Sequence, residues 1–306
     1  MRSGAAVSSL MRRFPFPGDP VPAFRNVVAP SVLVCPCCCE RYRRRMDLSA
    51  ARVLITGASR GIGLELARTL HAQGATIIGT ARSEASIAAA VEELDMIPVV
   101  GDLNDPAVAD RVIDEALNHG PIDVLINNAG IEIVGQIAEQ DPDDLRAVIG
   151  VNLEVPITLA HHVLAHMLER GSGRIVNISS MASVVSSPGW ATYSASKAGL
   201  SSFSRSLKTE LAGTGVGVTV VEIGFVQTDM LDDLRSNEFV KASFDRYKRL
   251  GLARIMEAGE VASAIAIAIE KERSHVRLPK RSIAMSMIAN APRRFAELVQ
   301  KGVPTA

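Results

Sequence analysis

Residues 53–73 read VLITGASRGIGLELARTLHAQ, an apolar run that passes through three glycines into a segment with helical spacing. The first three residues are typical of a buried strand, and Ile62, Leu66 and Leu70 share one face of a helix expected over 61–73. Glycines without a Cβ let a pyrophosphate approach the backbone, and a helix N-terminus favours an anion. The stretch therefore predicts a dinucleotide-binding turn. The alternative is a tight turn that needs glycine only for its conformation.

The same alternation continues along the chain. Further strands are expected at 76–78, 97–100, 124–126, 174–178 and 218–221, and further helices at 86–94, 106–118, 142–169 and 193–211. Nearly continuous apolar strands that alternate with helices indicate a parallel sheet covered on both faces. We therefore expect an α/β fold with a doubly wound, Rossmann-like parallel sheet in a single domain over 47–306. Pro98 makes the pairing of its strand the weakest of the set.

Composition sets limits on the partners of the chain. The 306 residues are 47% hydrophobic and 22% charged, which is enough to bury a sizeable core, and the formal net charge is zero. A neutral chain has no charge excess to attract a polyanion, so no nucleic-acid partner is expected. No apolar run reaches the roughly 18 residues of a membrane span. We therefore expect a cytoplasmic protein.

The N-terminal segment differs from the rest of the chain. Residues 1–46 contain eight Arg, no Lys and no hydrophobic periodicity. We interpret this segment as a disordered extension, or as a misassigned start upstream of Met46; a targeting segment is the remaining alternative. It also holds every cysteine of the chain in a cluster without the paired spacing of a zinc site, so no metal site is expected: Cys35, Cys37, Cys38 and Cys39.

Polar and glycine-rich segments follow each expected strand. Ligands of doubly wound sheets bind beyond the carboxyl ends of the strands, and these segments all fall there. They are TGASRGIG at 56–63, Gly101-Asp102-Leu103, NNAG at 127–130, Ser179-Ser180, and Gly224 with Thr228. Their common location carries more weight than any one of them.

Tyr193 and Lys197 are four residues apart in Tyr-Ser-Ala-Ser-Lys, and Ser180 precedes them by thirteen residues. Residues four apart share a helix face, so the Lys197 ammonium can stabilise a phenolate at Tyr193. Moving a phenol pKa from about 10 to about 7 takes roughly 4 kcal/mol. One cation and a positively charged cofactor ring together can supply this free energy. Tyr193 is therefore predicted to exchange a proton with a substrate oxygen.

With these motifs the chain resembles the single-domain form of the short-chain dehydrogenase/reductase family over residues 51 to about 230. The resemblance implies that Tyr193 is the general acid/base, that Lys197 lowers its pKa and binds the nicotinamide ribose, and that Ser180 holds the substrate oxygen. Asn152 would hold a water of a proton relay, although it could instead cap or kink its helix. The cofactor-binding residues implied are Gly57, Ser59, Arg60, Gly61, Ile62, Gly63, Arg82, Asp102, Leu103, Asn128, Ala129, Gly130, Tyr193, Lys197 and Thr228.

Cofactor choice is argued from the segment after the second strand. A carboxylate there usually accepts the ribose 2′-hydroxyl of NAD, whereas a 2′-phosphate needs cations. The chain has Ala81 and Arg82 at this point, and Arg60 lies in the glycine-rich loop. Arginine binds phosphate with two parallel hydrogen bonds, so NADP (NADPH) is expected over NAD. Glu84 instead favours NAD, because its carboxylate could accept a hydrogen bond from the ribose 2′-hydroxyl.

The C-terminal part departs from the family pattern. Ile223 stands where the family usually has the Pro of Pro-Gly, and an apolar stretch at 283–288 follows in place of a Gly-rich last strand. Residues 229–256 are expected to form a lid whose apolar residues favour a lipophilic small-molecule substrate, although they could simply pack on the sheet. The resemblance implies that the helices at 142–169 and 193–211 form a subunit interface, in a homodimer or a homotetramer. A hydride-transferring oxidoreductase is the predicted function, and a non-catalytic NADP sensor or scaffold is the alternative.

Overall fold

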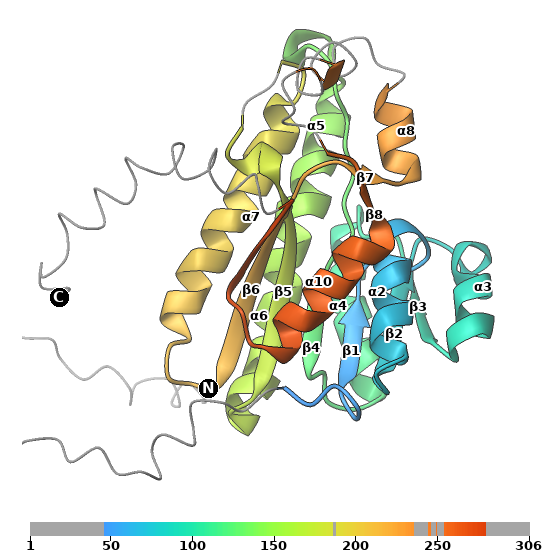
Figure 1. The fold of residues 1–306 in the computed structure, drawn as a ribbon, viewed down its shortest axis with the longest axis vertical. Coiled ribbons are helices and arrows are strands. Elements are labelled where there is room, and N and C mark those ends of the chain that lie inside the picture. Colours follow the sequence, from blue (N-terminus) through green and yellow to red (C-terminus); the bar gives the residue numbers. More distant parts are fainter. Residues whose placement is uncertain (1–45, 186–187, 236–243, 246–248, 250–253, 280–306) are drawn as a thin grey trace, which may run out of the picture. The chain divides into compact units, whose positions relative to one another are not determined.

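Seven parallel strands run through the centre of the structure (Figure 1), a computed structural model that describes residues 46–185, 188–235, 244–245, 249 and 254–279. The strand order is β3-β2-β1-β4-β5-β6-β9. Successive strands are added outward on one side of β1 up to β3, and from β4 onward they are added on the other side. This order confirms the predicted doubly wound Rossmann-like sheet. The strands are β1 (Arg52–Ile55), β2 (Thr76–Ala81), β3 (Ile97–Val100), β4 (Val124–Asn127), β5 (Gly173–Ser180), β6 (Val216–Ile223) and β9 (His275–Leu278).

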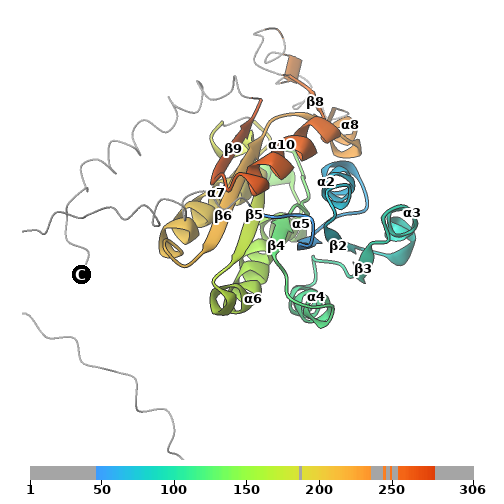
Figure 2. The same ribbon diagram turned by 60° about the horizontal axis from the view of Figure 1, so that its bottom comes forward.

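Helices cover both faces of the sheet (Figure 2). One face carries α2 (Gly61–His71), α3 (Glu84–Leu94) and α10 (Ala258–Glu270), and the other carries α4 (Pro106–Asn118), α6 (Val155–Arg170) and α7 (Ala191–Glu210). The shorter elements are η2 (Ile137–Glu139), α5 (Pro142–Ile149), the π-helical turn η3 (Gly150–Glu154), η4 (Met181–Ser183), α8 (Asp229–Arg235) and the strand pair β7 (Val226–Gln227) and β8 (Met256–Glu257).

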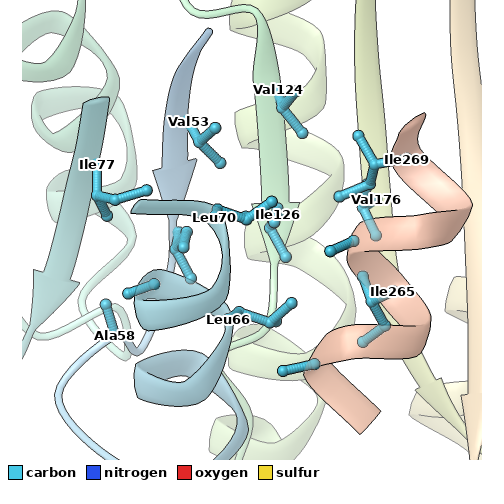
Figure 3. Close-up of a cluster of buried hydrophobic side chains, with 14 of the residues drawn as sticks. Val53, Ala58, Leu66, Leu70, Ile77, Val124, Ile126, Val176, Ile265 and Ile269 are labelled. Carbon is cyan, nitrogen blue, oxygen red and sulfur yellow. The ribbon is translucent and has the colours of Figure 1, made fainter. Parts of the chain in front are cut away.

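Alternate residues of each strand feed two separate cores. Val53 and Ile55 of β1 pack with α2 and α10, whereas Leu54 packs with α4 and α6. Figure 3 shows Leu66 and Leu70 of α2 meeting Ile265 and Ile269 of α10 above the strands. Full burial of a side chain of this size contributes about 1.5–3 kcal/mol. The period of two in the strands and of 3.6 in the helices therefore fixes which face each element covers.

Side-chain caps set where several helices begin. The Asp105 carboxylate accepts the Ala107 N–H at 3.0 Å, with Pro106 in the first turn of α4. Asp141 accepts the Asp143 N–H at 2.8 Å in the same way at the start of α5. Both satisfy an otherwise free helical N–H.

Most predicted elements are confirmed to within a few residues. Pro98 is tolerated because β3 is an edge strand that pairs only with β2. The helix expected at 142–169 is α5, η3 and α6 in one continuous stretch, with a π-helical turn at its middle. This stretch, Pro142–Arg170, is the one helix among the described residues that is long and apolar enough to cross a membrane. Its α6 part packs beside α4 on the same face of the sheet, where its buried side chains join the core.

Apart from the short elements, strand β9 and helix α10 were not predicted. The segment after residue 271 lacks the Gly-rich strand of the family, yet β9 pairs in parallel with β6 along its whole length, from Val220 opposite His275 to Ile223 opposite Leu278. Val276 and Leu278 face the core, so the residues themselves carry the two-residue period of a strand. Helix α10, which precedes β9 and brings the chain back to the β6 edge of the sheet, was also not predicted.

Three predictions fall wholly or partly outside the described residues. They are the extension at 1–46, of which only Met46 is described, the apolar stretch at 283–288, and most of the lid at 229–256. Of the lid, α8 is described together with a few later residues. Leu231 and Phe244 are buried, and Met230 is exposed.

Candidate active site

The carboxyl ends of β1 and β4 are joined by a network of hydrogen bonds. Asn128 and Ala129 donate their backbone N–H groups to Thr56 Oγ1 at 3.0 and 2.9 Å. The Asn128 amide donates to the Thr56 carbonyl at 2.9 Å and to the Gly57 carbonyl at 3.2 Å. The NNAG segment, predicted to line the cofactor cleft, therefore also holds the glycine-rich turn in place.

The glycines of the first turn are required by its geometry. Gly57 and Gly61 have φ of +67° and +56°, in the left-handed region that favours glycine. A Cβ on Gly63 would lie 2.1 Å from the Gly57 carbonyl oxygen, and one on Gly61 would lie 3.3 Å from Thr228 Cγ2. The second distance places Thr228, from beyond β6, against the turn after β1.

The N-terminus of α2 fits an anionic group. The N-cap residue, Arg60, makes no side-chain cap, and the first turn contains no acidic residue. Its first N–H groups are therefore free to face a phosphate. Arg60 itself is exposed and pairs with Asp229 at 3.1 Å.

The residues expected around the adenosine half of a dinucleotide lie at the ends of β2 and β3. Arg82 is exposed directly after β2, and among the described residues it has no hydrogen bond or ion pair. Glu84 is exposed in the first turn of α3. Asp102 is exposed and accepts the Asn104 N–H at 3.0 Å, whereas Leu103 is buried. The alternative that Asp102 caps α4 is wrong, because Asp105 does so.

Buried polar side chains hold helix α7 on β5, and only Ser179 among them was singled out from the sequence. Ser179 Oγ donates to the Lys197 carbonyl at 3.0 Å and lies 2.7 Å from Ser201 Oγ. One turn further along, Asn177 Nδ2 donates to Ser204 Oγ at 2.8 Å. These contacts fix the position of α7 along β5, and therefore the position of its catalytic candidates relative to Ser180.

Ser180 and Tyr193 come together in the structure as predicted. Ser180 ends β5, where its hydroxyl accepts the Ala182 N–H at 3.1 Å and also forms a hydrogen bond with the Tyr193 phenol. The Lys197 ammonium lies 5.8 Å from the centroid of the Tyr193 ring. It is buried and donates to the Ile178 carbonyl at 3.1 Å.

The pKa of Tyr193 departs from expectation in direction. Burial, and then the nearby Glu132, raise the pKa of the phenol above its ordinary value, while the Ser180 hydrogen bond lowers it. Burial also lowers the pKa of Lys197 to about 8, against the attraction of Glu132. Without the cofactor's positive ring, the protein alone therefore keeps the phenol protonated.

Asn152 occupies the π-helical turn and is fully buried. Its Oδ1 accepts the Ile131 N–H at 2.9 Å, and its Nδ2 donates to the Ile131 carbonyl at 2.8 Å and to Ser196 Oγ at 3.2 Å. The side chain therefore ties the segment after β4 to α7. This placement agrees both with a role in holding a water of a proton relay and with a role in distorting the helix.

Aromatic and apolar side chains form one wall of the site. Ala182, Trp190, Val134, Tyr193 and Phe225 pack together. The ring centroids of Phe225 and Trp190 are 6.2 Å apart. Phe225 also meets Phe244 edge to face, with ring centroids 4.9 Å apart. The turn that precedes Phe225, where the family proline is replaced, is tied to β9 by the Gly224 N–H, which donates to Leu278 at 2.8 Å.

Within the described ranges no three His, Cys, Asp or Glu side chains are grouped so as to hold a metal ion.

Glu132 is a titratable residue in the site that the sequence analysis did not identify. Its signal was available, since it is the one charged residue in the apolar run after NNAG.

Comparison with known proteins identifies the family. Residues 51–238 match the family described as short chain dehydrogenase. Ketoacyl reductase HetN of Nostoc sp. (strain PCC 7120) is 36% identical over 78% of this chain and 82% of its own length. The 3-oxoacyl-(acyl-carrier-protein) reductase FabG of Escherichia coli (strain K12) is 34% identical over 76% of this chain and 94% of its own.

Solved structures agree with the sequence comparison. A short-chain dehydrogenase from Streptomyces avermitilis matches with a TM-score of 0.70 and 29% identity, over 85% of this chain and all of that one. A Beutenbergia cavernae structure, described as an NAD(P) dependent gluconate 5-dehydrogenase with bound NADP at low occupancy, matches with a TM-score of 0.68 and 29% identity. It covers 76% of this chain and 97% of its own. This chain therefore belongs to the short-chain dehydrogenase/reductase family and is an NAD(P)-dependent oxidoreductase that acts on C=O and CH–OH groups.

Proposed function

We propose that the protein is an NADPH-dependent reductase of lipophilic carbonyl compounds. The observation that carries this proposal is the hydrogen-bonded pair of Ser180 and Tyr193, with the Lys197 ammonium close to the ring, beside an aromatic wall. A proton donor and a second hydroxyl aimed at one point suit a carbonyl oxygen. The curated relatives include reductases named for ketoacyl and 3-oxoacyl groups, so a 3-oxoacyl chain is the substrate class to test first.

Each residue has a role in this proposal. Tyr193 donates its proton to the carbonyl oxygen, and Ser180 donates a hydrogen bond to the same oxygen as negative charge develops there. Lys197 supplies the positive charge next to the phenol. Asn152 holds the segment after β4 in place through its hydrogen bonds to the backbone of Ile131. Bound NADPH supplies the hydride. The apolar wall of Trp190 and Phe225 excludes water from the substrate chain.

The residues present fit a dinucleotide. A side chain at Gly63 would fill the space that the turn needs, and the start of α2 leaves its N–H groups free. The guanidinium of Arg82, which has no partner in the part of the chain that the structure describes, supports the choice of NADP over NAD, with Arg60 as the second cation. Asp102, Leu103, Asn128 and Thr228 would border the rest of the cofactor.

The test is the substitution Tyr193→Phe, which removes the proton donor and little volume. We expect kcat for NADPH-dependent reduction of a 3-oxoacyl thioester to fall by about 100-fold or more, as for loss of a general acid, while the Kd for NADPH is nearly unchanged. Thr209→Val, which removes a hydroxyl from the exposed end of the same helix, is the control and should retain activity. Full turnover in Y193F would refute the assigned proton donor. NADPH binding without turnover of any carbonyl by the wild-type protein would instead favour a sensor or scaffold.

A further inference from the structure

The segment that follows β4 brings a carboxylate into the site. Glu132 stands between Ile131 and Ile133, and its side chain is half-buried. Among the described residues its carboxylate makes no hydrogen bond or ion pair. Burial without such partners costs free energy, so a carboxylate in this position calls for a physical reason.

The backbone on both sides of Glu132 is fixed. Asn152 bonds both the N–H and the carbonyl of Ile131, and the Gly135 N–H donates to the Gly189 carbonyl at 3.0 Å. At Gly130, a Cβ would lie 3.4 Å from Lys197 Nζ. The segment therefore begins alongside the lysine. It then passes the tyrosine, since Val134 packs in the same cluster as Tyr193.

The titratable groups that act on Glu132 both come from α7. Lys197 is attracted to its carboxylate, and Tyr193 is disfavoured as a phenolate by it. Asn152 and Ser180, which face the same space, carry no charge. Burial raises the pKa of the Glu132 carboxyl to about 7, although Lys197 pulls it down.

We propose that Glu132 is the proton-relay residue of this enzyme, exchanging protons between solvent and the Lys197–Tyr193 pair. This inference rests on the proposed function. In reduction the Tyr193 O–H bond breaks as its proton passes to the carbonyl oxygen, whose carbon receives the hydride. The phenolate then regains a proton from the Lys197 ammonium, and the neutral amine regains one from the Glu132 carboxylic acid through an intervening water molecule. Solvent reprotonates the carboxylate, so each turnover consumes one hydride and one proton.

Two properties suit Glu132 to that position. Its pKa of about 7 lies close to the pKa of about 8 of Lys197, so a proton moves between them at little cost in free energy. Residue Glu132 is partly exposed, whereas Lys197 is buried, so solvent lies nearer to Glu132 than to Lys197. A fully buried carboxylate would have no exchange with solvent, and a fully exposed one would have an ordinary pKa.

The first experiment needs no substrate or cofactor. Infrared difference spectroscopy of the full chain, titrated from pH 5 to pH 9, should show a carboxylic acid band that is lost around pH 7. Glu132→Gln should remove that band. Glu139→Gln, which changes an exposed glutamate on η2, is the matched control and should retain it. A band that persists in E132Q would assign the titration to another carboxyl and overturn the proposal.

The second experiment measures the pH dependence of reduction. In the wild-type protein kcat should fall as pH rises through about 7, because the relay donor loses its proton, and in the oxidation direction it should rise. E132Q should lack this inflection and have a kcat at pH 6 lower by about 10-fold or more. Glu132→Asp, which keeps a carboxylate, should restore part of the rate and the inflection. E139Q should follow the wild type.

The outcomes separate this inference from the proposed function. A pH profile of E132Q that superimposes on the wild type, with Y193F inactive, would leave the Tyr193 mechanism intact and exclude the relay. Wild-type turnover that survives in Y193F would refute the proposed function, whatever Glu132 does in the infrared titration.

Discussion

Burial opposes both charges that the proposed reaction needs at Tyr193 and Lys197. It raises the pKa of the phenol and lowers the pKa of the ammonium to about 8. A protonated tyrosine is the form that donates a proton in reduction, so the site without cofactor is already set for that direction. In oxidation the phenolate must form, and the positive ring of an oxidised nicotinamide is the additional charge that favours it.

Arg82 is the residue at which cofactor preference is tested. An arginine–phosphate hydrogen bond contributes about 1.5–3 kcal/mol, so Arg82→Ala should raise KM for NADPH by roughly 10- to 100-fold. KM for NADH, which lacks the 2′-phosphate, should change little. Arg146→Ala removes an exposed arginine of α5 that pairs only with Asp143 among the described residues, and it serves as the control. Equal effects of R82A on both cofactors would contradict the assignment.

At the scale of elements, the sequence predicted the sheet well because its signals are local. The two-residue period of β1 and the 3.6-residue period of α2 lie within a few residues of each other along the chain. The sequence also predicted that three candidate residues of the site lie close together: Tyr193 and Lys197 are one turn apart on α7, and Ser180 ends the preceding strand. Ser204 was not predicted, since its contact with Asn177 spans 27 residues. Glu132 was not predicted either, because the residue that interacts with its carboxylate, Lys197 of α7, lies 65 residues later in the sequence.

The unpredicted strand β9 is held by a buried ionic cluster. Glu222 of β6 is buried and accepts hydrogen bonds from His275 at 3.0 Å and from Arg277 Nε at 2.8 Å, both on β9. Arg205 of α7 lies 4.0 Å away on the other side. Burial alone would raise the pKa of Glu222, but His275 and Arg277 hold the pKa below its usual value.

Glu222→Gln should therefore destabilise the protein by about 3 kcal/mol at neutral pH, as for a broken buried ion pair. Because the folded-state pKa is depressed, the contribution is present above the unfolded value of 4.5 and is lost as pH falls through the folded value. Urea unfolding at pH 7 and below pH 4 should show the difference from the wild type shrinking in acid. Glu115→Gln, which breaks an exposed pair on α4, should cost under about 1 kcal/mol. A difference independent of pH would exclude the ionic account.

At the scale of the whole molecule, α6 is more apolar than its packing on the sheet requires. Ile157 and Leu168 are 37% and 44% exposed, and eleven residues make slightly more than three full helical turns, so they lie on one face. An apolar face of this kind suits a second copy of the chain, in line with the expected homodimer or homotetramer.

The double substitution Ile157→Glu, Leu168→Glu tests that face. Burying these carboxylates between two copies of the helix is costly, because a two-fold contact brings the carboxylates of one copy close to those of the other. We expect sedimentation velocity to show a wild-type oligomer and a smaller species for the double variant, with unchanged circular dichroism. Ile137→Glu places the same charge on η2, where the isoleucine is 54% exposed, and should leave the assembly intact. An unchanged sedimentation coefficient in the double variant would place the interface elsewhere on the molecule.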